Sequence, residues 1–327
     1  MSVAVQLVDA ATTARHLGAP ALIAALRAMF THGCDVPLRH THKIGAAGTL
    51  LLMPAWRAGA RLGVKTVTIF PGNGAVGLPG LHSTYLLFDA TTGVPLAQLD
   101  GNEITSRRTA AASALAASFL ARPDARRLLV VGAGRVASLI PDAMRAVRPI
   151  DDVTVWNHRP ASAHALAAEW NRAGLHAQVS DDLAHAVGRA DIVSCATLAD
   201  SPLIHGEWLR PGAHLDFIGS FTPQMREADP RCFARSRVFV DTVEALTKAG
   251  DMLDAIAAGS FDEAQLQGTL AELCQGTRGG RANPAEITLF KSVGTALEDL
   301  AAAELVFDAV TRESLSLAAS STSAPPP

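Results

Sequence analysis

The sequence predicts an α/β protein with a doubly wound parallel sheet, and three observations carry this prediction. An apolar segment, Arg127–Val131, leads directly into Gly132 and Gly134 and then into a helical pattern. From there onward, short apolar runs alternate with alanine-rich helical segments, which is typical of parallel sheets covered by helices. Before Arg122, candidate strands follow one another across turns, which indicates an antiparallel or mixed sheet.

The first part of the chain is expected to form a helix near Ala21–Phe30 and then the mixed sheet. The strand candidates of that sheet are Thr49–Met53, Gly63–Phe70, Ser83–Asp89 and Pro95–Asp100. Pro123-Asp124 is the expected junction. The parallel sheet should then contain Leu128–Val131, Val153–Trp156, Ala177–Val179, Asp191–Ala196, His214–Ile218 and Val238–Val240.

The last part of the chain has two segments with different sequence patterns. Pro284–Val310 has the spacing of one long amphipathic helix, and a break near Gly294 is left open. Ser316–Pro327 is rich in Ser, Ala and Pro, so we expect it to be disordered.

Composition narrows the class of protein. The chain has 327 residues with 49% hydrophobic content, which suffices for two domains with real cores. A net charge of −3 gives no basic surface for nucleic acid, and no segment has the pattern of a signal peptide or a membrane span. The four cysteines form no Cys-x-x-Cys pair, which indicates reduced thiols. We therefore expect a soluble, cytoplasmic protein.

The turn after Arg127–Val131 has the spacing of a dinucleotide-binding turn, with Ala137 in place of the third glycine. Gly132 permits the tight turn, and Gly134 lets the backbone approach a pyrophosphate whose oxygens the N–H groups of the helix start can hold. Such turns also occur without a ligand, so a purely structural role remains the alternative. The residues expected to bind a nicotinamide dinucleotide here are Gly132, Ala133, Gly134, Arg135 and Val136.

The end of the next strand indicates which dinucleotide is bound. Val153–Trp156 leads into Asn157, His158 and Arg159, with no acidic residue where NAD-specific sites bind the ribose hydroxyls. Arg159 has the charge that a 2′-phosphate needs, and the other two residues can add hydrogen bonds. The sequence therefore favours NADP over NAD, with a solvated loop arginine as the alternative reading.

Several stretches together resemble the ornithine cyclodeaminase/mu-crystallin family. In the family's order they are Leu62–Lys65, Phe70–Asn73, Gly77–Pro79, Asp89–Gly93, Ile104–Ala111, the turn at Gly132, Ser220–Glu227 and Ile287–Gly294. The resemblance implies a Rossmann domain, residues 122–285, inserted in a mixed α+β substrate-binding and dimerisation domain, residues 1–121 with 286–315. It also implies a homodimer joined through the N-terminal sheets.

The resemblance assigns roles to residues that have ordinary explanations on their own. A lone lysine in a strand, such as Lys65, is normally solvated, but in the family it faces the substrate and can transfer a proton. Arg108 precedes an alanine-rich helix, where the helix dipole disfavours a cation, so it is better explained as a fork for a carboxylate. The family pattern adds Arg39 to this carboxylate site, Val293 as an apolar substrate contact, and Thr197 to the nicotinamide pocket.

One position departs from the family's cyclodeaminases. Their turn carries an aspartate at the reacting amine, whereas this chain reads Gly219-Ser220-Phe221, and Asp216 is a poor positional substitute. Removing an amine proton needs that carboxylate, but reducing a C=N bond does not. The sequence therefore favours NAD(P)H-dependent reduction of a small cyclic imino acid, 1-pyrroline-2-carboxylate or 1-piperideine-2-carboxylate. The Ser-Phe-Thr-Pro turn is also similar to the reductase branch.

Two other functions remain as alternatives. One is NAD-dependent ornithine cyclodeaminase, and the other is a non-catalytic NADP-binding protein of the mu-crystallin type. We expect no metal site: His40 and His42 lack a third ligand, so we interpret them as loop residues.

Overall fold

The computed structural model describes residues 5–322, and the chain divides into two compact units. The terminal unit combines the chain up to Met29, Gly33–Arg108 and the chain from Thr295, and the central unit combines Phe30–His32 with Thr109–Gly294. The divisions fall at 108/109 and 294/295 rather than at the expected 121/122 and 285/286. The difference arises because most of one long helix and one further strand belong to the central unit.

The terminal unit is built on a six-stranded sheet in the order β1-β6-β5-β4-β3-β2. The strands are β1 (Gln6–Val8), β2 (His40–Ile44), β3 (Gly48–Trp56), β4 (Arg61–Ile69), β5 (Leu81–Asp89) and β6 (Pro95–Asp100). All neighbours are antiparallel except β1 and β6, so the expected mixed sheet is present. The loop interpretation of His40 and His42 was wrong: both lie in the edge strand β2, whose residues are all exposed and therefore show no apolar alternation.

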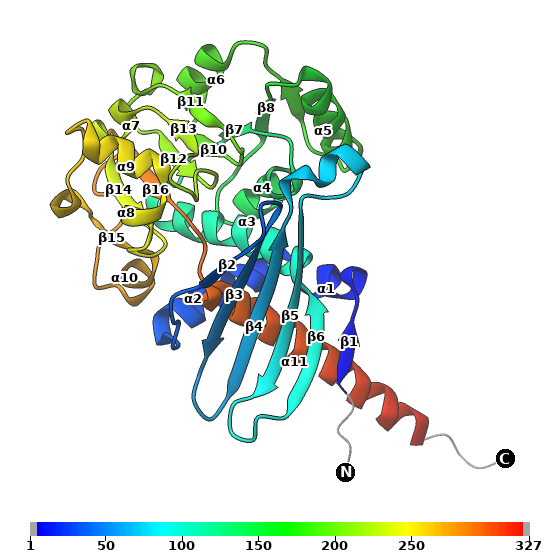
Figure 1. Cartoon of the computed structure of the whole chain (residues 1–327). Coiled ribbons are helices and arrows are strands. Elements are labelled where there is room, and N and C mark those ends of the chain that lie inside the picture. Colours follow the sequence, from blue (N-terminus) through cyan, green and yellow to red (C-terminus); the bar gives the residue numbers. More distant parts are fainter. Residues whose placement is uncertain (1–4, 323–327) are drawn as a thin grey trace. The chain divides into compact units, whose positions relative to one another are not determined.

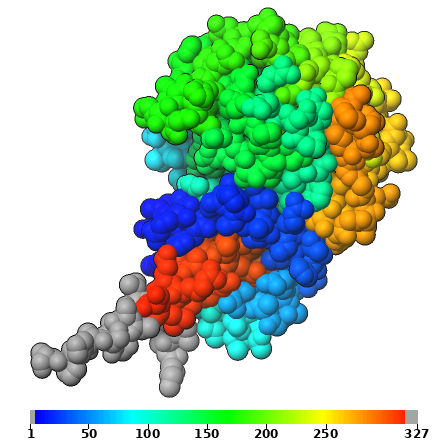
Figure 2. Space-filling model, turned by 180° about the vertical axis from the view of Figure 1, so that it is seen from behind, coloured from blue at the N-terminus to red at the C-terminus, as the bar shows by residue number. Residues whose placement is uncertain are grey.

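Helices cover one face of this sheet. They are α1 (Ala10–His16), α2 (Ala19–His32) and α11 (Ala296–Thr322), and a short 3-10 helix, η1 (Pro71–Val76), follows β4. Helix α11 lies across the sheet against β3 and β4, and α1 lies beside it (Figures 1 and 2). The buried strand residues Met53, Lys65 and Tyr85 are direct cross-strand neighbours, so they share one face of the sheet. Lys65 pairs with Asp299 of α11, so this is the face that the helices cover.

Two expectations for the chain end were wrong. Thr288–Lys291 is a strand, β16, and the helix begins only at Ala296, after Gly294 at φ 75°. All four residues of β16, Thr-Leu-Phe-Lys, are buried, so the strand lacks the alternation of buried and exposed residues that would separate it from a helix. Of the segment expected to be disordered, residues 316–322 continue helix α11, and residues 323–327 lie outside the described part.

The central unit contains an eight-stranded parallel sheet in the order β15-β14-β16-β12-β10-β7-β8-β9. Besides β16 its strands are β7 (Arg127–Val131), β8 (Asp152–Trp156), β9 (Ala177–Val179), β10 (Ile192–Cys195), β12 (His214–Phe217), β14 (Arg237–Val240) and β15 (Gly268–Thr269). A second, two-stranded sheet pairs β11 (Asp200–Ile204) with β13 (Arg226–Ala228). The predicted α/β class with a doubly wound parallel sheet is confirmed.

Helices connect these strands. They are α3 (Gly101–Leu120), α4 (Arg135–Arg145), α5 (Pro160–Arg172), α6 (Leu183–Arg189), α7 (Pro230–Ala234), α8 (Ala245–Lys248), α9 (Gly250–Ala257) and α10 (Leu270–Gln275), with 3-10 turns η2 (Gly206–Trp208) and η3 (Glu263–Gln265). The chain winds away from β7 in both directions, first to β8 and β9 and then to β10 and β12. A crevice for a ligand is therefore expected at the carboxyl ends of β7 and β10, where the order reverses.

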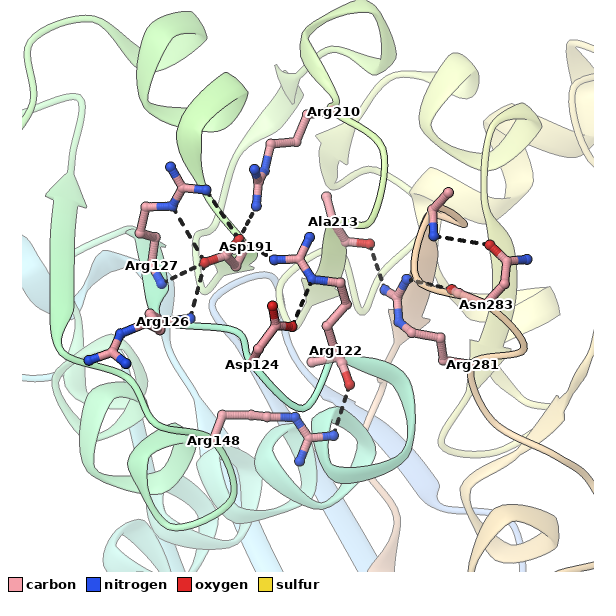
Figure 3. A network of polar contacts seen from close by, with 12 residues as sticks. Arg122, Asp124, Arg126, Arg127, Arg148, Asp191, Arg210, Ala213, Arg281 and Asn283 are labelled. Atoms are coloured by element: carbon pink, nitrogen blue, oxygen red, sulfur yellow. Dashed lines mark hydrogen bonds and ion pairs between the residues drawn. The ribbon is translucent and has the colours of Figure 1, made fainter.

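The opposite ends of β7 and β10 are tied together by Asp191, which immediately precedes β10 (Figure 3). Its carboxylate accepts hydrogen bonds from the backbone N–H groups of Arg126 and Arg127 at 3.0 and 2.9 Å. Arg122 donates to it at 2.7 Å, and Arg210 adds a further ion pair. One buried carboxylate thus fixes the register of the two strands that carry the crevice.

Over residues 5–322 no helix is both long and apolar enough to cross a membrane.

Candidate functional site

The turn after β7 has the geometry that its glycines predict. Gly132 has φ 112°, and a Cβ there would lie 2.6 Å from the carbonyl oxygen of Ala196, so only glycine fits. Gly134 caps helix α4 and is surrounded by open space, whereas Ala137 is fully buried. The backbone at the start of α4 is therefore exposed to a ligand, while the helix packs closely on the sheet.

A cavity of about 530 Å³ lies at this turn. Most of the residues expected to bind the dinucleotide line it: Gly132, Ala133, Gly134, Asn157, His158, Arg159 and Thr197. Arg135 and Val136 form the first turn of α4 and are not among its lining residues. Residues from the ends of β7, β8 and β10 thus converge on one cleft, which is the place that the sheet topology predicts for a dinucleotide.

The part of the cleft beyond β8 is polar and positively charged. Asn157 donates to the carbonyl oxygen of Arg159 at 3.1 Å, which shapes the loop that leads into α5. His158 and Arg159 are exposed there, and no carboxylate follows β8. The cleft therefore fits a nicotinamide dinucleotide, with a guanidinium at the loop that would meet the adenosine half.

Thr197, at the end of β10, is held by a residue that the sequence analysis missed. Its backbone N–H and its hydroxyl both donate to Oε1 of Glu227, each at 2.8 Å. Glu227 is fully buried on β13, and burial raises the pKa of its carboxyl to about 8, although Lys291 lowers it. The only sequence signal was the position of Glu227 in the stretch that carries the family resemblance.

The turn after β12 carries Phe221 where a carboxylate was looked for. Ser220 stands at φ 51°, and its hydroxyl donates to the carbonyl oxygen of Met225 at 2.7 Å. The Phe221 side chain is 39% exposed. Asp216 is fully buried and accepts a hydrogen bond from Ser194 at 2.6 Å, so it is committed inside the sheet. Burial raises the pKa of Asp216 to about 6.

Val293, the expected apolar substrate contact, belongs to the central unit and follows β16. Its backbone N–H and that of Gly294 donate to Oδ2 of Asp241, at 2.8 and 2.6 Å. The side chain is buried. Asp241 was not predicted; it follows β14, which lies next to β16 in the sheet.

The terminal unit contains a buried ion network around two predicted residues. The Lys65 ammonium lies 2.7 Å from one carboxylate oxygen of Asp299 and 2.8 Å from the other. Arg108 donates from Nε to Asp299 at 3.0 Å and from Nη1 to Glu298 at 2.5 Å. All four residues are buried. The structure thus brings Lys65 and Arg108 together, and it adds Asp299 and Glu298, which the sequence analysis missed.

The expected position of Arg108 at a helix start was wrong. Helix α3 begins at Gly101, so Arg108 lies in its second turn, beyond the reach of the dipole argument. What places a cation there is the pair of carboxylates on α11. Two cations and two carboxylates balance in charge, so a substrate carboxylate would join a network whose cations already have partners.

Burial lowers the pKa of Lys65 to about 8, although Asp299 opposes this shift. A buried ammonium with such a pKa can give up a proton near neutral pH.

Arg39 is half-buried and immediately precedes β2. By strand register it stands in line with Met53 of β3, which pairs with Lys65 of β4, so it lies at the sheet edge nearest to the network. Within residues 5–322, no group of three or more possible metal ligands is found.

Comparison with known proteins shows which family the sequence matches. The sequence matches the model of the ornithine cyclodeaminase/mu-crystallin family over residues 4–314. An uncharacterised protein of Schizosaccharomyces pombe is 47% identical over 94% of this chain and 98% of its own. The Δ1-pyrroline-2-carboxylate reductase of Paracoccus denitrificans is 43% identical over 79% of this chain and 83% of its own.

A solved structure is similar along nearly the whole chain. It is the Δ1-pyrroline-2-carboxylate reductase of Thermococcus litoralis in complex with NADH and L-proline, with a TM-score of 0.87 and 32% identity. The similarity covers 94% of this chain and 98% of that chain.

Proposed function

The chain belongs to the ornithine cyclodeaminase/mu-crystallin family, and from this premise we propose that it is an NAD(P)H-dependent reductase of a small cyclic imino acid. The substrate is 1-pyrroline-2-carboxylate or its six-membered homologue, 1-piperideine-2-carboxylate. The observation that carries the proposal is Phe221, which occupies the turn where a cyclodeaminase of the family would place its aspartate. The nearby carboxylate of Asp216 is buried and engaged with Ser194.

The chemistry of the two directions explains why this turn matters. A cyclodeaminase starts from an amine, which must lose a proton before hydride can leave the α-carbon. A reductase starts from a C=N bond, and it needs an orienting site and a source of one proton. A phenyl ring can line the site of an uncharged ring but cannot accept the amine's proton. The turn therefore supports the reductive direction.

Lys65 and Arg108 are the residues we assign to the substrate. The guanidinium of Arg108 binds the imino acid carboxylate, and Lys65 binds it as well and delivers the proton. The lowered pKa of Lys65 supports this second role, because a proton held at a pKa of about 8 is available at neutral pH. We assign Arg39 to the same carboxylate and Val293 to apolar contact with the ring.

The cofactor is a nicotinamide dinucleotide, with NADP preferred over NAD. When bound, it supplies the hydride. The N–H groups at Gly132–Gly134 and the start of α4 would hold the pyrophosphate, and Thr197, which lines the same cleft, would meet the nicotinamide. The preference for NADP is supported by exposed Arg159 and by the lack of a carboxylate after β8.

We also propose a homodimer. The sheet face away from α11 carries half-buried apolar residues on three neighbouring strands: Leu52, Pro54, Trp56, Leu62, Val64, Leu86 and Phe88. Such a contiguous apolar face is typical of a subunit interface. Neither nucleic acid nor a membrane is part of the proposal.

Two alternatives remain distinguishable. Ornithine cyclodeaminase activity would require a base at the turn after β12, where Phe221 stands. A non-catalytic NADP-binding protein would have no need for a buried pair of substrate-directed cations, so Lys65 and Arg108 speak against it. Initial rates with both imino acids and with NADPH and NADH test the proposal. Turnover of at least one imino acid supports it, and cofactor binding without any turnover would favour the binding protein.

A further inference from the structure

Glu227 makes an unusual contact with the wall of the dinucleotide cleft. Its Oε1 accepts hydrogen bonds from both the backbone N–H and the hydroxyl of Thr197, at 2.8 Å each. Two donors of one residue converging on one oxygen fix both the backbone and the χ1 angle of that residue. Thr197 lines the cleft, whereas Glu227 is fully buried behind it and is not among the lining residues.

The neighbouring backbone leaves room for this contact. A Cβ on Gly219 would lie 2.4 Å from Oε1 of Glu227 and 2.4 Å from the carbonyl oxygen of Thr197. A side chain at residue 219 would thus push the carboxylate away from Thr197. The glycine after β12 is therefore required by the contact between β10 and β13.

Glu227 is itself held in place. The backbone N–H groups of Glu227 and Ala228 donate to Oδ1 of Asp251, at 2.7 and 3.1 Å. The N–H of Asp251 donates to the Ser220 hydroxyl at 3.0 Å. The end of β10, strand β13 and the turn that bears Phe221 are thereby joined through the carboxyl groups of Glu227 and Asp251 and the backbone N–H of Asp251.

The buried carboxyl of Glu227 does not help to stabilise the fold. Lys291 lies 3.9 Å from Asp251, and Oε2 of Glu227 is buried without a hydrogen-bond partner among residues 5–322. A buried carboxyl that is only partly satisfied generally destabilises the fold relative to an apolar side chain of similar volume. Such groups are concentrated at functional sites, where strain and polarity serve binding.

We propose that Glu227 is a positioning residue of the dinucleotide cleft: it holds Thr197 in the orientation that the nicotinamide end of the cofactor requires. The proposal rests on the proposed function, because it takes the cleft to bind a nicotinamide dinucleotide. It assigns to Glu227 a role in cofactor affinity exercised only through Thr197. Glu227 itself touches neither cofactor nor substrate.

The test is a double-mutant cycle on cofactor affinity in the full-length protein. The dissociation constant for NADPH, and for NADH in parallel, is measured by quenching of protein fluorescence; Trp156 lines the cleft and reports directly. Thr197→Val should weaken binding about threefold to tenfold, and Thr197→Ser should restore it to within about twofold of wild type. Glu227→Leu should weaken binding about 10- to 100-fold, because both donors of Thr197 lose their acceptor.

Two variants separate positioning from general damage. Glu227→Gln keeps an acceptor oxygen for Thr197 and should restore affinity to within about threefold. Asp216→Asn alters another fully buried carboxyl, which bonds to Ser194 rather than to Thr197 and is not among the lining residues, and it should leave affinity unchanged. In steady state, the cofactor KM of the Glu227→Leu variant should rise more than its kcat falls.

The double variant decides the mechanism. If Glu227 acts through Thr197, Glu227→Leu with Thr197→Val binds no more weakly than Glu227→Leu alone. Additive effects, or unchanged affinity in the single variants, would overturn the proposal. Should Glu227→Leu fail to fold, Thr197→Val and Thr197→Ser in the wild-type protein decide the matter, because equal cofactor affinity of these two variants would overturn the proposal. A wild-type protein that binds neither NADPH nor NADH would instead refute the proposed function itself.

Discussion

Lys65 and Asp299 form a buried ion pair with 2.7 Å between Nζ and Oδ2, although 234 positions separate them in the sequence. The same carboxylate accepts a hydrogen bond from Arg108 at 3.0 Å. Asp299 is therefore the common counter-ion of the two residues that we assign to the substrate. It orients both cations. Its charge also raises the pKa of Lys65 and so opposes part of the lowering that burial causes.

The pH dependence of the reaction tests this relationship. Lys65 must be protonated to deliver a proton, and its pKa of about 8 means that the active form prevails below that pH. We expect kcat/KM for the imino acid to fall as pH rises through about 8. Asp299→Asn removes the charge that raises the pKa of Lys65, so this alkaline limb should move to lower pH. A limb that stays in place in Asp299→Asn and persists in Lys65→Met would show that another group titrates.

Arg108→Ala should remove substrate recognition while leaving cofactor affinity intact. Losing a buried guanidinium–carboxylate contact should lower kcat/KM for the imino acid about 100- to 1,000-fold. Arg107→Ala is the matched control, because its side chain pairs with Glu103 on the same helix and should change little. If Arg108→Ala loses NADPH affinity but handles substrate normally, the carboxylate site has been placed wrongly.

Arg159 should determine the choice of dinucleotide. Arg159→Ala should raise the KM for NADPH about 10- to 100-fold, because a charge-assisted contact to the 2′-phosphate is lost, and it should barely change the KM for NADH. Arg172→Ala, at the other end of α5, is the control. Equal KM values for the two cofactors in the wild type would contradict the assignment.

Asp191 should matter for stability rather than for chemistry. Its buried carboxylate compensates Arg122 and Arg210 and accepts two backbone N–H groups, so Asp191→Ala leaves several donors unsatisfied. The free energy of unfolding should fall by about 3 kcal/mol, the lower end for a broken buried ion pair, because the arginines are partly solvated. Asp151→Ala breaks the exposed pair with Arg126 and should have little effect in the same urea titration.

What the sequence predicted well is encoded locally. Gly132, Gly134 and Ala137 act within a few residues of one another, so their spacing alone defines the turn from strand to helix. Four strands of the mixed sheet, β3 to β6, were predicted because each has one buried and one more exposed face, whereas β1 and β2 were missed. The family resemblance is confirmed by a match that spans almost the whole chain.

What the sequence did not predict depends on distant pairing. Asp299 and Glu298 pair with Lys65 and Arg108 only because α11 packs against the sheet that carries Lys65. Nothing near these two residues in the sequence indicates this contact. Glu227 is linked to Thr197 across 30 positions through a three-residue strand. Strand β16 was taken for part of a helix because burial on both faces removes the alternation that distinguishes strands.

The central claim is that this chain reduces a cyclic C=N bond and does not release ammonia from ornithine. The most direct measurement compares the two reactions with one preparation: NADPH oxidation with 1-pyrroline-2-carboxylate, and ammonia and proline release from ornithine with NAD. We expect clear NADPH oxidation, and ammonia release lower by about 10²–10⁴-fold, the usual contribution of a positioned general base. Robust ammonia release, stoichiometric with proline, would contradict the account and restore the cyclodeaminase assignment.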